Sequence, residues 1–137
     1  MEKEASIKSW ISLILRLAFV FLFLGATVEN FVNGLDAMLT SFTEMFKDTW
    51  LPAPLVVLHA RVIPWVEMVL TVWLLLGIRL KEAWIVTALT LISLAFGMVV
   101  LKQSHIAANN FTYVFMACVG LYFSQYDKWN VGSLIKR

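Results

Sequence analysis

Four long apolar stretches, separated by short polar breaks, constrain this sequence more than any other feature. They run over residues 10–28, 55–78, 83–101 and 106–123. Each is close to the roughly 20 residues that an α-helix needs to cross the hydrocarbon core of a bilayer. The stretches are continuous and do not alternate with polar residues, which is typical of helices and not of the strands of a membrane barrel. The sequence therefore predicts an all-α integral membrane protein with a bundle of four transmembrane helices.

The composition supports the same class. Of the 137 residues, 61% are hydrophobic and 15% are charged, whereas soluble domains average about 45–50% apolar and about 25% charged residues. We expect one membrane domain over residues 1–137, with the lipid bilayer as its main surroundings. The net charge of +2 is too small to indicate a nucleic-acid partner.

The polar segment between the first two stretches carries a pattern of its own. Its apolar residues recur at spacings of three and four, which is typical of one apolar stripe on a helix. The segment is too polar to cross a membrane, so we expect an amphipathic helix over about residues 35–50 in the first, outer loop. The stripe comprises Leu35, Met38, Leu39, Phe42, Met45, Phe46 and Trp50.

Basic residues in the breaks predict the orientation, because cytoplasmic loops carry an excess of Lys and Arg. Four spans place both chain ends and the break after residue 78 on one side, and only Lys47 and Lys102 on the other. Both termini are therefore expected in the cytoplasm, with Trp10, Trp84 and Trp129 at the inner interface and Trp50 near the outer one. The basic residues of the predicted inner side are Lys3, Lys8, Arg79, Lys81, Lys128, Lys136 and Arg137.

Two ionisable residues lie well inside the apolar stretches, where a charge needs a partner or a purpose. Glu67 falls near the centre of the second stretch, and Arg16 lies in the first. We predict an ion pair between them. It would either fix the packing of two helices or leave Glu67 to handle a proton or bind a ligand.

The predicted topology also gathers polar residues toward the outer side. This candidate cluster suits a quinone, because ring carbonyls accept hydrogen bonds and His and Glu can relay protons. Plain hydrogen bonding between helices is the alternative. Two histidines alone indicate haem or a metal only weakly, so no metal site is predicted. The cluster comprises Glu29, His59, Arg61, Glu67, His105 and Asn109.

Cys118 is the only cysteine of the chain. One cysteine cannot form a disulfide within the chain, so a dithiol–disulfide reaction carried by this chain alone is excluded. An oxidoreductase built on this chain would need a partner subunit for the other half of its chemistry.

Several short motifs resemble the DoxX family of small four-helix membrane proteins. They are Arg16-Leu17, Gly25, Pro54, Glu67, the run Leu74-Leu75-Leu76-Gly77-Ile78-Arg79, and Asn109. The resemblance covers roughly residues 15–121. It implies membrane redox chemistry, since a related DoxD protein is a subunit of a thiosulfate:quinone oxidoreductase, and it implies the prokaryotic inner membrane. Glu29-Asn30 departs from the pattern, because many members have a Lys there.

Three functions remain open at this stage. The first is a redox-associated, quinone-contacting subunit of a larger membrane oxidoreductase complex. The second is a non-catalytic structural, accessory or assembly subunit of a membrane complex. The third is a small transporter, which the absence of a detectable inverted repeat disfavours. Catalytic residues and the substrate are not predicted.

Overall fold

A computed structural model describes residues 1–131 of the chain, and helices are the regular elements of that part. Four of them are long and apolar enough to cross a membrane. The predicted class, an all-α membrane protein with four spans and one further helix in the first loop, is confirmed. The helices are α1 (Glu2–Asn33), α2 (Leu35–Phe46), α3 (Ala53–Leu76), α4 (Leu80–Val100) and α5 (Ser104–Phe123), followed by the short 3₁₀ helix η1 (Ser124–Tyr126).

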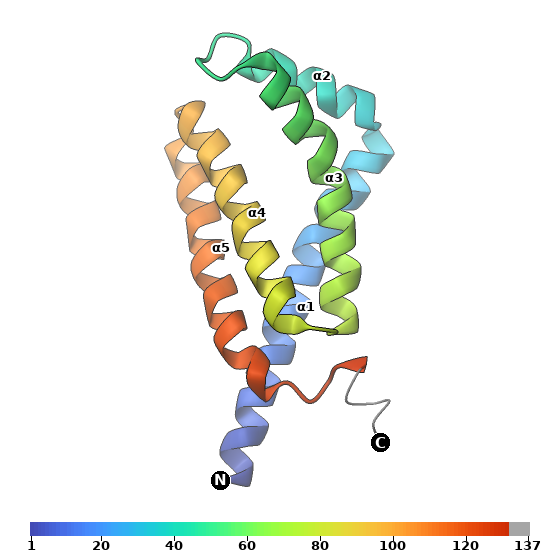
Figure 1. The fold of residues 1–137 in the computed structure, drawn as a ribbon, viewed down its shortest axis with the longest axis vertical. Helices are drawn as coiled ribbons and strands as arrows, with labels where there is room; N and C mark the ends of the chain where they lie inside the picture. The colour runs from blue at the N-terminus through green and yellow to red at the C-terminus, as the bar shows by residue number, and fades with distance from the viewer. Residues whose placement is uncertain (132–137) are drawn as a thin grey trace.

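The long helices form two pairs that run side by side (Figure 1). One pair is α1 with α3, and the other is α4 with α5. The pairs meet near the end of the bundle that holds the N-terminus, which we call the N-terminal end. Toward the opposite end α3 diverges from α4, and α2 lies across this end beside α3; we call it the α2 end.

Glycine and proline mark several helix boundaries. Gly34 alone separates α1 from α2, and its φ of 94° is one that residues with a side chain rarely adopt. Pro52 is the N-cap of α3, where a missing N–H costs nothing. Gly77 ends α3 in the left-handed conformation, with its N–H donating to the Trp73 carbonyl at 2.9 Å.

The core lies where the two helix pairs meet. The Trp84 side chain is fully buried there, and its ring meets that of Phe19 edge-on at 5.1 Å between centroids. Leu70 and Leu74 of α3 belong to the same buried cluster. Gly120 of α5 leaves the space that the indole of Trp84 fills, because a Cβ atom there would lie 2.6–2.8 Å from ring atoms.

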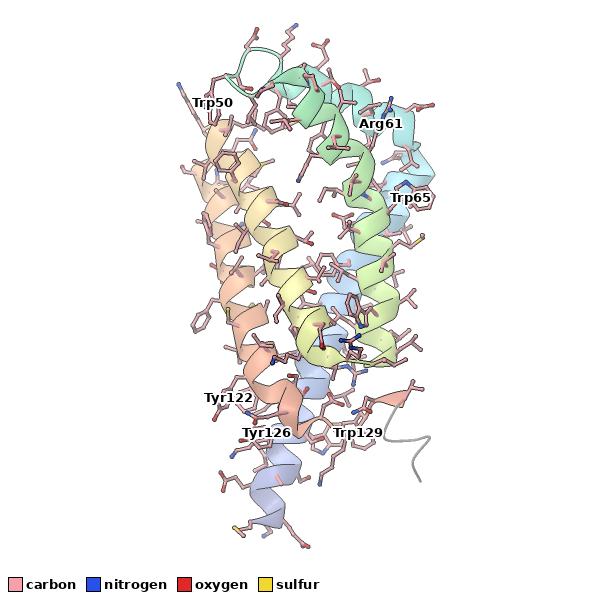
Figure 2. The ribbon with its side chains drawn as sticks, viewed as in Figure 1. Trp50, Arg61, Trp65, Tyr122, Tyr126 and Trp129 are labelled. Carbon is pink, nitrogen blue, oxygen red and sulfur yellow. The ribbon has the colours of Figure 1, made fainter. Side chains whose placement is uncertain are left out.

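Many large apolar side chains face away from the core on all four long helices, among them Phe21, Val69, Leu89 and Phe115. A water-soluble protein rarely exposes so much contiguous apolar surface, whereas lipid-facing helices require it. Aromatic residues gather at both ends of this surface (Figure 2). Trp50, Trp65 and Arg61 lie toward the α2 end, and Tyr122, Tyr126 and Trp129 lie toward the N-terminal end.

Two details of the sequence-based picture need correction. The first helix is longer than the predicted 10–28, because no proline lies between Glu2 and Gly34 and the helix continues through Gly25. Trp84 does not lie at an interface but in the core. Trp10 and Trp129 do lie together, with ring centroids 5.2 Å apart. Two of the basic residues counted for the orientation, Lys136 and Arg137, fall outside the described residues.

The close approach of Gly120 to Trp84 predicts a difference between two Gly→Ala variants. Gly120→Ala forces the indole to move, so we expect it to lower the free energy of unfolding by about 1–3 kcal/mol, the usual cost of overpacking a core. Gly25→Ala is the matched control, because a Cβ atom at this helical position meets nothing within 4 Å. Thermal unfolding in detergent, followed by tryptophan fluorescence, measures both. Equal melting temperatures would contradict the packing described for Trp84.

Candidate functional site

The most densely bonded polar site of the structure surrounds Arg16, toward the N-terminal end of α1. The residue is only 2% exposed, although its side chain is charged. Its Nε donates to the Leu74 carbonyl and its Nη2 to the Leu75 carbonyl, each at 2.9 Å. These two carbonyls belong to the last turn of α3, where helical partners are lacking. Arg16 thereby joins α1 to the end of α3.

The remaining nitrogen of the guanidinium reaches the segment after η1. Nη1 of Arg16 contacts both carboxylate oxygens of Asp127, at 3.1 and 3.2 Å, and donates to the Trp129 carbonyl at 3.2 Å. The side chains of this ion pair are 3% and 0% exposed. A buried ion pair needs further hydrogen bonds to offset the cost of removing both charges from water. Here backbone carbonyls provide them on the arginine side.

Two serines of α1 complete the site by contacting Asp127 and Lys128. Ser12 donates to Oδ2 of Asp127 at 2.7 Å, and Ser9 accepts a bond from the Lys128 N–H at 3.2 Å. Asp127 also accepts from the Trp129 N–H at 2.9 Å. The spacing of Ser9, Ser12 and Arg16 places all three on one face of α1. We call this set of interactions the Arg16–Asp127 latch: it holds the segment from Asp127 to Asn130 against α1 and the end of α3.

Gly77 is needed for the latch as well as for the end of α3. A Cβ atom at this position would fall on the guanidinium of Arg16 and would lie 2.9 Å from Cβ of Asn130. Its φ of 72° adds a second reason for glycine. Gly77 therefore both ends α3 and leaves room for the buried guanidinium of Arg16.

A smaller polar contact joins α1 to α3 nearer the α2 end. Nδ2 of Asn30 donates to Oε2 of Glu67 at 3.2 Å, and Glu67 is 6% exposed. Thr71 bonds within α3, to the carbonyl of Glu67, at 2.8 Å. Pro64, one turn before Glu67 in α3, is also buried. An amide and a carboxyl side chain thus meet inside the bundle, as interhelical contacts in membranes commonly do.

The predicted ion pair between Arg16 and Glu67 is wrong. Arg16 pairs with Asp127, and Glu67 contacts Asn30. The physical reason is distance along α3. The guanidinium lies at the carbonyls of Leu74 and Leu75, and Leu74 is roughly 10 Å along the helix axis from Glu67.

The six residues of the predicted polar cluster do not come together. Only Glu67 and His59 are withdrawn from the surface, and they have different partners, because Nε2 of His59 lies 3.2 Å from Oγ of Ser93. Counting along the helices predicts a similar level in the membrane for the five residues other than Glu67, but residues at a similar level can lie on different faces of their helices. The four exposed members are Glu29, Arg61, His105 and Asn109.

The sequence interpretation missed Asp127, Ser9 and Ser12. A signal was present, since the two serines and Arg16 recur at helical spacing and Asp127 is the acidic residue that follows the last apolar stretch. Pairing them required knowing that the segment after η1 contacts α1. Cys118 lies in α5 and is exposed, so it is not part of either polar site.

Comparison with known families identifies the family of this chain. The family model that matches is described as methylamine utilisation protein MauE, and it covers residues 8–110. The chain belongs to the MauE family. No curated protein and no solved structure gives a match.

The assignment to the DoxX family is therefore wrong. Its best motif, the leucine run that ends in Gly77 and Arg79, has a local explanation in the structure. Gly77 is the C-cap of α3, and Arg79 is the N-cap of α4 with a φ of 49°. Residues that end one membrane helix and start the next recur in unrelated families, so they do not identify one. In this MauE-family chain, Arg16 and Gly77 also serve the latch.

The latch predicts strong coupling between its two charged residues. Removing one partner leaves the other charge buried and uncompensated, so Arg16→Leu or Asp127→Leu alone is expected to cost about 3–5 kcal/mol of unfolding free energy. The double variant removes both charges and should cost clearly less than the sum of the two. Asp48→Leu, at an exposed residue after α2, is the control. Denaturation of the four variants in detergent measures the coupling, and strictly additive losses would refute it.

Proposed function

We propose that this MauE-family protein is an accessory membrane subunit of a redox system that serves methylamine utilisation. The observation that carries the accessory role is the latch. The buried charge of Arg16 is held by acceptors of the chain itself, which is a structural use of an arginine. The family match supports the link to methylamine.

The family match supports the redox association, and the cysteine content limits what this chain alone can do. Methylamine utilisation implies oxidation of the amine, and this chain has only one cysteine. Disulfide exchange needs a thiolate and a disulfide, which together hold three sulfur atoms, so at least two of them must come from other molecules. Any thiol chemistry at Cys118 would therefore be shared with a partner. Within a larger complex, a second subunit would carry the redox groups.

We further propose that the protein lies in the prokaryotic plasma membrane with both termini in the cytoplasm. The support is the distribution of basic residues in the fold. Lys47, Arg61 and Lys102 lie toward the α2 end, whereas a larger set lies toward the N-terminal end, as the positive-inside rule requires of the cytoplasmic side. In the described part of the chain that set comprises Lys3, Lys8, Arg79, Lys81 and Lys128.

Growth on methylamine tests the role. We expect deletion of the gene in its own host to abolish or strongly slow growth with methylamine as the only nitrogen source, and to leave growth on ammonium unchanged. A plasmid copy of the wild-type chain should restore growth, and so should the packing-neutral variant Gly25→Ala. Undiminished growth of the deletion strain on methylamine would overturn the proposal.

A further inference from the structure

A pocket opens between α2, α3 and α4 toward the α2 end of the bundle. Its volume is about 490 Å³, within the roughly 300–1,000 Å³ of sites for small organic ligands. All three helices contribute to its wall. The residues that matter for its chemistry are Phe42, Phe46, His59, Ser93, Phe96 and Gly97.

The pocket exists because of three features of the chain. The divergence of α3 from α4 toward this end separates their backbones (Figure 1). Gly97 of α4 has no side chain to fill the space, and a Cβ atom there would lie 3.4 Å from Cζ of Phe46. The apolar stripe of α2 covers the space, with Phe46 buried and Phe42 stacked near it at 6.2 Å between centroids. Trp50 contacts Phe96 edge-on at 6.1 Å.

One polar pair interrupts this apolar wall. Nε2 of His59 lies 3.2 Å from Oγ of Ser93, and Ser93 itself donates to the Thr90 carbonyl at 2.7 Å. A hydroxyl has a single proton, so the Ser93 oxygen accepts a hydrogen bond from His59 in the tautomer that carries the proton on Nε2. His59 can therefore donate its Nε2–H hydrogen bond to another acceptor, while Ser93 keeps its own bond within α4. The pair is an exchangeable donor on an apolar surface.

We propose that this pocket binds a membrane quinone, with its ring against the phenylalanine side chains and one ring carbonyl accepting the Nε2–H of His59. A quinone is flat, apolar over most of its surface and carries carbonyl acceptors, which matches aromatic walls with one donor. Its isoprenoid tail would leave the pocket toward the lipid-facing surface. A saturated acyl chain would not use the donor. The inference concerns a ligand site and stands whether or not the chain serves methylamine utilisation.

Binding of a short-chain benzoquinone with one isoprenoid unit tests the site. The full chain is placed in nanodiscs of synthetic phosphatidylcholine, which contain no quinone, and retained quinone is measured against empty nanodiscs. We expect saturable binding of one quinone per chain. His59→Leu should weaken binding about three- to tenfold, the effect of one neutral hydrogen bond. Gly97→Leu should abolish binding by filling the pocket.

Two further variants serve as controls for this test. His105→Leu changes the other histidine, which is exposed in α5, and should bind quinone like the wild type. Gly97→Ala, whose Cβ fits against Phe46, should fold normally and bind quinone more weakly than the wild type. This variant therefore still tests whether filling the pocket weakens binding if Gly97→Leu misfolds. Quinone uptake no greater than in empty nanodiscs, or equal uptake by the His59 and Gly97 variants, would overturn the proposal. A phospholipid retained one per chain and not displaced by quinone would overturn it too.

Discussion

A guanidinium removed from water needs hydrogen-bond acceptors and a counter-charge, and the fold of this protein depends on where Arg16 finds them. The acceptors come from parts of the chain that are far apart in sequence: the last turn of α3 and the segment that follows η1. Asp127 balances the charge and is itself held by Ser12. Gly77 provides the space in which the groups meet. A single buried charge thus determines how α1, α3 and the segment after α5 are joined.

The two ends of the bundle consequently differ in character. At the N-terminal end, charge-assisted hydrogen bonds connect α1, α3 and the C-terminal segment, and the aromatic core around Trp84 lies next to them along the helices. At the α2 end, α3 and α4 are separated by an apolar pocket that an amphipathic helix covers. Apolar contacts without an ion pair are more easily rearranged than the latch, so ligand entry is expected at this end.

The sequence predicted the helices far better than the contacts between them. Apolar runs identify spans because a bilayer requires about 20 such residues, and the period of residues 35–50 identified α2 for a similar local reason. The partner of Arg16 was beyond such reasoning, because Asp127 lies 111 residues away and no pattern in one sequence encodes that contact. The predicted polar cluster was wrong because position along a helix gives the depth of a residue in the membrane, but not the side of the helix on which it lies. The pocket was missed because it depends on the divergence of two helices.

The protection of the Arg16 side chain is the most direct measure of the central claim. Nitrogen-15 labelling of the arginine side chains allows the exchange of each Nε–H with water to be followed by NMR in detergent. If Arg16 donates to the Leu74 carbonyl inside the bundle, one Nε–H signal will exchange slowly, and it will vanish in Arg16→Lys. Fast exchange of every arginine Nε–H in the folded protein would contradict the latch and with it the proposed joining of the helices.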